Sequence, residues 1–293
     1  MAAEAEPISR YYHWSERTVA KIAEEQSLDL VRGSRALALR PLPRNQAGIR
    51  RARHRDRVAR RIRRALGDRV VEDFAAPSQG PGGGRVGYAA GVGQVYMGRF
   101  VTWSSKRYTA YIYTRTIADN GQRIDVCLFG SMGDFPERIR RADSSETGWV
   151  TPAARWIEQL LDTDGRVSGR PATPQDYEPI AVEALKIMQY QGFDTHAELH
   201  RGLPQTRAFT LAHARPAEWF ARIVADVELT RRRWNVIELE DPDRILVGTP
   251  AWVRVRVNHP SALTLYTDEY RREGARHLEL RRRQLELGGH FVQ

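Results

Sequence analysis

Two β-forming runs lie on either side of a tight turn, an arrangement that leaves few folds open to the chain. Residues 107–116 and 122–129 are rich in β-branched and aromatic side chains, and Asp119-Asn120-Gly121 between them is a strong turn sequence. A third run of the same kind, 92–103, comes before them. The sequence therefore predicts an antiparallel hairpin within a larger sheet.

The N-terminal part predicts a strand followed by two helices. Residues 11–14 form a short strand-like run, and Ser15 stands where an N-cap belongs before a helix over 16–28. A second helix is expected over 48–66. Its narrow apolar stripe consists of Val58, Ile62 and Leu66. Residues 77–84, rich in glycine and proline, are expected to form a loop or linker.

The second half of the chain predicts a smaller α/β block. Capping and periodicity patterns predict helices at 151–161, 175–191, 216–232 and 268–287. β-forming runs predict strands at 207–213, 234–239, 245–247 and 251–257. We therefore expect an α+β fold in two domains. An antiparallel, hairpin-containing sheet with flanking helices and the basic helix would occupy 8–150, and the C-terminal α/β block would occupy 171–290.

Charge is the feature that bears most on function. The formal net charge is +10, which favours an anionic partner such as nucleic acid. Only three of the 46 basic residues are lysines. Because a GC-rich genome also produces such an arginine excess, part of the charge can arise without selection for binding.

Nine arginines lie between Arg50 and Arg64 in the predicted basic helix. Guanidinium groups address phosphates with forked donors, and residues three and four apart share one helix face. The predicted nucleic-acid-binding residues are Arg50, Arg53, Arg57, Arg60, Arg61 and Arg64. The alternative is a solvated helix face, or one paired with acids such as Glu72 and Asp73.

Aromatic side chains of the hairpin allow a second mode of binding. Those that could stack on bases are Trp103, Tyr108, Tyr111 and Tyr113. Alternation puts Tyr111 and Tyr113 on one face, as in sheet platforms for single strands. Packing in a core explains the same residues equally well.

A glycine-rich turn follows the hairpin. Its residues Gly130, Ser131, Gly133 and Asp134 are predicted to form a ligand-binding turn, because backbone amides and the serine hydroxyl can hold an anion. The alternative is an ordinary tight connection from strand to helix. A nucleophile elbow is disfavoured, since Phe129 occupies the position of its first glycine.

The sequence contains no strong catalytic motif. No lysine has the neighbours of a phosphate-binding loop, and Gly91-Val92-Gly93 lacks the spacing of a dinucleotide fingerprint. His196 and His200 have the spacing of metal ligands on a helix. A carboxylate cluster that could hold Mg²⁺ consists of Glu238, Glu240, Asp241 and Asp243. Polar surface explains both sets more simply, so we predict no metal site and can name no cofactor.

The chain is expected to be cytoplasmic and to have no membrane partner. No run approaches the roughly 18–20 apolar residues of a membrane span, and the N-terminal sequence lacks the pattern of a secretory signal. The single cysteine, Cys127, lies in a strand-like apolar run and is expected in the core.

Three short motifs stand out along the chain. They are Tyr11-Tyr12 with Trp14-Ser15-Glu16-Arg17, then Leu128-Phe129-Gly130-Ser131, and finally Leu246-Val247-Gly248-Thr249-Pro250-Ala251-Trp252-Val253. On these motifs the chain resembles a family of actinobacterial proteins without assigned function, whose members are suspected components of bacterial conflict or signalling loci. The resemblance spans most of the chain and implies no catalytic residue.

These observations predict a noncatalytic binding or sensor module that recognises nucleic acid or a nucleotide-like anion. Two alternatives stay open. One is a metal-dependent enzyme of phosphodiester or nucleotide chemistry, using the histidine pair or the carboxylate cluster. The other is a scaffold subunit whose charged helix over 268–287 docks a protein partner.

Overall fold

The computed structural model of the chain describes residues 9–29, 44–72, 87–101, 108–118, 120–140, 208–228, 242–256 and 262–265. Several predicted features lie outside these residues. They are the linker 77–84, the helices 151–161, 175–191 and 268–287, the strand 234–239, and Trp103.

The described elements begin with β1 (Ser9–Trp14), α1 (Glu16–Glu25), α2 (Arg44–Leu66), η3 (Gly67–Arg69) and β2 (Val70–Val71). The long strands are β3 (Tyr88–Val101), β4 (Tyr108–Ile117), β5 (Arg123–Ser131), β6 (Ala208–Glu228) and β7 (Arg244–Arg256). The short elements η4 (Met132–Asp134), α3 (Glu137–Arg140) and β8 (Ala262–Leu265) complete the set.

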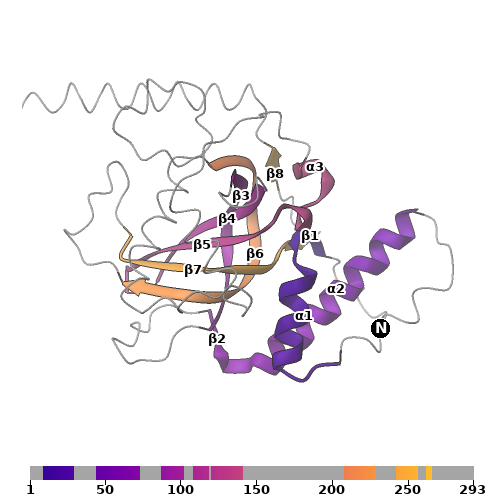
Figure 1. Ribbon diagram of the computed structural model, residues 1–293, viewed down its shortest axis with the longest axis horizontal. Helices are drawn as coiled ribbons and strands as arrows, with labels where there is room; N and C mark the ends of the chain where they lie inside the picture. Colours follow the sequence, from indigo (N-terminus) through magenta and orange to yellow (C-terminus); the bar gives the residue numbers. More distant parts are fainter. Residues whose placement is uncertain are drawn as a thin grey trace, which may run out of the picture.

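The five long strands close into a barrel (Figure 1). Around the ring β3 pairs with β4, β4 with β5, β5 with β7, β7 with β6, and β6 with β3 again. All of these pairs are antiparallel except β5 with β7, which is parallel. Outside the ring β1 pairs with β7, β2 with β3, and β8 with β6. Closure leaves the five strands without a free edge within the ring.

The predicted α+β fold, an antiparallel sheet flanked by helices plus a separate α/β block, is wrong. The described residues are mostly strand, and their sheet is a closed barrel. The predicted helix over 216–232 is strand as far as Glu228. Strands from both sides of the expected division, 8–150 and 171–290, pair within this one barrel.

Side-chain alternation along β6 explains the error over 216–232. Ala217, Trp219 and Ala221 point into the barrel core, while Phe220 between them joins the core outside the barrel. At Phe220 an apolar side chain thus interrupts the polar positions of β6, most of which are only partly buried, and apolar residues three and four apart within 216–228 also fit the period of a helix.

The predicted hairpin is confirmed by the pairing of β4 with β5, in which Tyr113 lies opposite Cys127. Cys127 is fully buried, as expected. The barrel core contains Met97, Ile112 and Leu128 from the three consecutive strands. Ile139 of α3 packs into the same core.

The predicted N-terminal strand and both N-terminal helices are confirmed. The side chain of Ser15 accepts a hydrogen bond from the Thr18 amide at 3.3 Å and so caps α1. In Figure 1, α1 and α2 lie together on one side of the barrel. They bury a second apolar cluster there, against residues such as Phe220 and Trp252. No helix among the described residues is long and apolar enough to cross a membrane.

Gly91 allows the barrel core to close around Trp219. The two residues are opposite each other in β3 and β6, and a Cβ atom at Gly91 would lie 2.9 Å from the indole ring. We expect Gly91→Ala to lower the free energy of unfolding by about 1–3 kcal/mol, because the ring must shift in a packed core. Urea denaturation measures this loss. Gly93→Ala is the matched control, since its Cβ would meet only Thr114 Oγ1, at 3.5 Å. Equal losses in the two variants would contradict the expectation.

Candidate nucleic-acid interface

Helix α2 lies on the barrel through one apolar face. Val58, Ile62 and Leu66 are at most 5% exposed, and they belong to the cluster that includes Phe220 and Trp252. The two aromatic rings are stacked, with centroids 4.3 Å apart. The predicted apolar stripe therefore fixes which side of α2 faces away from the barrel.

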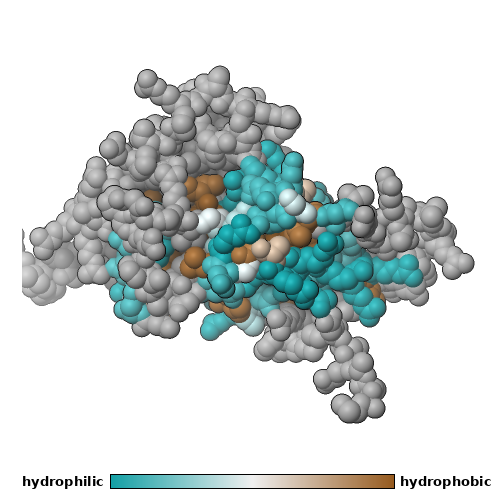
Figure 2. All heavy atoms as spheres, turned by 90° about the horizontal axis from the view of Figure 1, so that it is seen from below, coloured by the Kyte–Doolittle hydropathy of each residue, from teal (hydrophilic) through white to brown (hydrophobic). Residues whose placement is uncertain are grey.

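The face of α2 opposite this stripe consists of arginines. The six predicted binding residues, Arg50, Arg53, Arg57, Arg60, Arg61 and Arg64, are all exposed. At 3.6 residues per turn they fall within an arc of about 100°, and they extend over about 21 Å of helix. We call these six residues the arginine face. Figure 2 shows that hydrophilic side chains cover most of the described surface on this side of the molecule.

Four members of the arginine face are not engaged within the described part of the chain. Arg50, Arg53, Arg57 and Arg64 make no hydrogen bond or ion pair there, whereas Arg61 donates to the carbonyl oxygen of Asp29 at 3.1 Å. The arginines of α2 that pair with a described carboxylate are different residues, and helical spacing alone did not distinguish them from the arginine face.

These paired arginines are Arg55 and Arg63, and both point toward the barrel. The Arg55 guanidinium lies 5.2 Å from the centroid of the Trp14 ring and 3.4 Å from a carboxylate oxygen of Glu16. Arg63 lies over the ring of Phe220 and pairs with Glu72. Pairing with acids such as Glu72, the alternative to a binding surface, therefore holds for Arg63, whereas Arg50, Arg53, Arg57 and Arg64 make no ion pair within the described residues.

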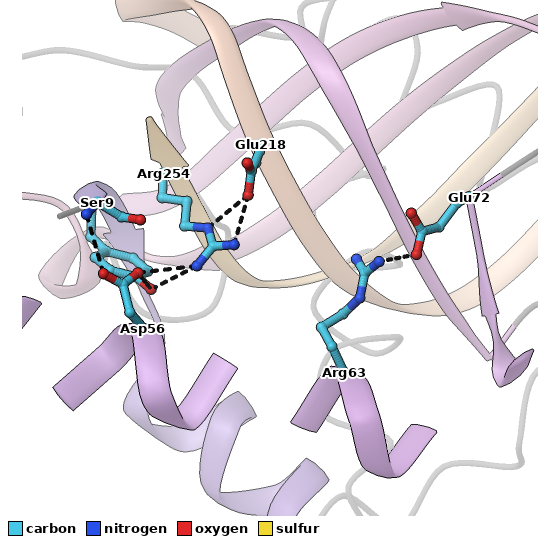
Figure 3. Close-up of polar contacts among 7 residues, drawn as sticks. Ser9, Asp56, Arg63, Glu72, Glu218 and Arg254 are labelled. Carbon is cyan, nitrogen blue, oxygen red and sulfur yellow. Dashed lines mark hydrogen bonds and ion pairs between the residues drawn. The ribbon is translucent and has the colours of Figure 1, made fainter. Parts of the chain in front are cut away.

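Asp56 is the only acidic residue of α2, and it fastens the helix to the barrel (Figure 3). Its Oδ1 accepts hydrogen bonds from the Tyr11 hydroxyl at 2.8 Å and from Arg254 at 3.1 Å. Its Oδ2 accepts from the Ser9 amide at 3.2 Å. Arg254 also donates to Glu218, at 2.8 Å. Burial raises the pKa of Tyr11 although Arg254 opposes it, so Tyr11 stays a protonated donor.

The predicted ligand-binding turn lies at the end of β5 and in η4. Within it the Gly133 amide donates to Ser131 Oγ at 3.1 Å. Burial raises the pKa of the Asp134 carboxyl, and its neighbours include Ser15 and Glu16. One amide of the turn is thus already used, and two carboxyl groups lie close by. Anion binding at Gly130, Ser131, Gly133 and Asp134 stays a prediction.

His13 lies beside this turn and is fully buried. Its Nε2 is 3.8 Å from an Asp134 carboxylate oxygen, and its ring meets Phe135 edge to face. Within the residues that the structure describes, neither ring nitrogen has a hydrogen-bond partner. Burial, with a smaller contribution from Arg55, lowers the pKa of His13 to about 3. The imidazole is therefore neutral near pH 7, and nothing in the sequence pattern indicated this.

The aromatic residues of the hairpin have different surroundings. Tyr111 and Tyr113 share a face of β4, as alternation predicts, because Ile112 between them points into the barrel. Tyr111 is fully buried and presents no ring to a ligand, whereas Tyr113 is partly exposed. Trp103 and the side chain of Tyr108 lie outside the described part.

The candidate metal ligands fall mostly outside the described residues. This applies to His196, His200, Glu238, Glu240 and Asp241. Asp243 is described, and its Oδ2 accepts a hydrogen bond from the Arg123 amide at 2.9 Å where β5 and β7 begin to pair. Within the described ranges no three His, Cys, Asp or Glu side chains are grouped as metal ligands would be.

Comparison with known proteins gives no relative for this chain. No family model, no curated protein and no solved structure matches it.

Proposed function

We propose that this protein is a binding module that holds nucleic acid through the arginine face of α2. The observation that supports this most is the separation of roles among the arginines of one helix. Those that stabilise the fold, Arg55 and Arg63, point toward the barrel, while all six of the arginine face are exposed. Six cations on one rigid surface repel each other unless an anion neutralises them.

The chemistry of the arginine face suits a phosphate backbone. Each guanidinium offers forked donors to phosphate oxygens, and the helix holds the groups at fixed spacing. Such contacts position a protein on nucleic acid without reading its sequence. The five-stranded Greek-key barrel is also the architecture of OB-fold domains, many of which bind oligonucleotides. That likeness concerns the architecture alone.

Replacing part of the arginine face tests the proposal. We expect the variant with Arg50, Arg53, Arg57 and Arg64 changed to Gln to bind oligonucleotides more weakly. The slope of log affinity against log salt concentration should also fall in magnitude by about 3 to 4. The reason is that binding no longer neutralises four phosphates and so no longer releases their counterions. Fluorescence anisotropy with labelled oligonucleotides over a salt series measures both quantities.

Arginines elsewhere on the surface provide the matched control. Arg10 of β1 and Arg140 of α3 are exposed, and their double change to Gln removes the same charge as Arg53→Gln with Arg57→Gln. If the arginine face is the site, only the second pair lowers the salt slope. Equal effects of the two pairs would mean that affinity follows net charge. An absence of binding by the wild-type protein at low salt would refute the proposal.

A further inference from the structure

A row of three aromatic side chains crosses the outside of the barrel on β6, β3 and β4. Tyr96 of β3 is opposite His213 of β6 on one side and opposite Tyr113 of β4 on the other. The ring centroids are 5.7 Å apart for Tyr96 and His213, and 6.0 Å apart for Tyr96 and Tyr113. We call these three residues the aromatic row. All three are partly exposed.

Strand alternation fixes the direction of the aromatic row. The neighbours of Tyr96 in β3, Val95 and Met97, belong to the barrel core, and so does Ile112 beside Tyr113. The three rings therefore stand on the outer surface of the sheet. Core packing, the alternative considered for the hairpin aromatics, accounts for the buried Tyr111 but not for this row.

The rings are uncharged and held in place. Burial lowers the pKa of His213 and raises that of Tyr113, so near pH 7 the imidazole is neutral and the phenol is protonated. The Tyr113 hydroxyl donates to Asp125 Oδ1 at 3.1 Å, and the Tyr96 hydroxyl accepts from Gln94 at 2.6 Å. Neutral aromatic faces fixed across a sheet are what unpaired bases stack on.

Cations lie along the same surface. Arg115 follows Tyr113 on the outer face of β4 and donates to both oxygens of Asp125, at 2.6 and 2.9 Å, with its side chain 25% exposed. Arg215, two residues after His213 in β6, is exposed. Because β4 and β6 are both antiparallel to β3, the two guanidinium groups lie on the Gln94 side of the row, one near each end, where they can meet the backbone of a strand whose bases stack on the rings.

Strand β3 connects the aromatic row to the helix that carries the arginine face. Tyr88 and Ala90 at the start of β3 pack in the cluster beneath α2, on the same side of the strand as Tyr96. Eight residues separate Tyr88 from Tyr96, or about 26 Å of extended chain. Sites of about 4–16 nucleotides are usual for barrels that bind single strands, and a strand of that size can reach both features.

We infer that the aromatic row is a base-stacking platform and that the nucleic acid bound by this protein is single-stranded. The inference depends on the proposed function. In a duplex the faces of the bases are covered by their neighbours, so the rings have nothing to stack on, whereas the arginine face binds the phosphates of either form.

The test compares full-length wild-type protein with Tyr96→Leu and Tyr113→Leu. The labelled probes are oligo-dT, oligo-U and a mixed-sequence DNA duplex of equal length. Leucine keeps apolar bulk but removes the ring, so each change should weaken binding of the single strands by about 5- to 150-fold and leave duplex binding unaltered. Tyr96→Phe is the matched control and should bind as the wild type does, because it keeps the ring.

The outcomes separate this inference from the proposed function. Leucine variants that bind single strands like the wild type would overturn the platform and leave the arginine face intact, as would a wild-type preference for the duplex. That preference is measured without any substitution, so it decides the question even if a leucine variant does not fold. Failure of the wild type to bind any of the three probes would overturn both proposals.

Discussion

Lowering the pH from neutrality to pH 3 is expected to cost this protein about 4–5 kcal/mol of unfolding free energy through His13 alone. The fully buried imidazole has its pKa lowered to about 3 in the folded state, against about 6.5 in the unfolded chain. At a pH between these two pKa values, the imidazole is protonated in the unfolded chain and neutral in the folded protein. The contribution of the neutral His13 to the free energy of unfolding is therefore fully present above about pH 6.5. It falls as the pH drops, at up to about 1.4 kcal/mol per pH unit.

The surroundings of His13 offset part of this loss. Burial raises the pKa of the neighbouring Asp134 carboxyl. A carboxyl group with a raised pKa takes up its proton more readily in the folded state, so its contribution has the opposite sign and favours folding as the pH drops. Arg55 acts in the same direction as burial, because its charge also disfavours the imidazolium form of His13.

Urea denaturation between pH 7 and pH 4 measures the effect in the wild type and in His13→Gln, which has no group to titrate at this position. We expect the pH dependence to become shallower in His13→Gln even if the variant is less stable at pH 7. His54→Gln, at a partly exposed histidine of α2, is the matched control, because it removes a histidine without removing the buried one. Parallel curves for the wild type and His13→Gln would show that His13 does not account for acid sensitivity.

Local sequence signals predicted the local structure well. The turn sequence at 119–121 identified the hairpin of β4 and β5, and Ser15 marked the start of α1 because its hydroxyl caps the first turn. The spacing of Val58, Ile62 and Leu66 identified the buried side of α2, and with it the exposed side that carries the arginine face.

Local sequence signals did not predict the closure of the barrel, which depends on pairing between strands far apart in the sequence. Asp125 of β5 lies beside Ile245 of β7, and no pattern near either residue indicates a partner so far along the chain. The error over 216–232 has the same origin, because Phe220 is apolar on a face of β6 that elements distant in sequence cover, helix α2 among them. The burial of His13 and the alignment of His213 with Tyr96 likewise depend on strands that are distant in sequence.

Asp56→Ala is expected to lower the free energy of unfolding by about 3 kcal/mol. The change leaves Arg254 with Glu218 as its remaining carboxylate partner among the described residues, and it removes the acceptor of the Tyr11 hydroxyl and the Ser9 amide (Figure 3). The Asp56 and Arg254 side chains are only 13% and 16% exposed, so water replaces the lost contacts poorly. Because Asp56 fastens α2, affinity for oligonucleotides should fall as well.

The second ion pair of α2 provides the comparison. Glu72, the partner of Arg63, is 60% exposed, and Glu72→Ala should therefore cost less than about 1 kcal/mol. A double-mutant cycle isolates the pair of interest, since Asp56→Ala should cost markedly less once Arg254→Met has removed the buried charge. Additive losses of Asp56→Ala and Arg254→Met would mean that the two side chains do not stabilise each other. Asp56 would then hold α2 through the Tyr11 hydroxyl and the Ser9 amide, beside the apolar side of the helix.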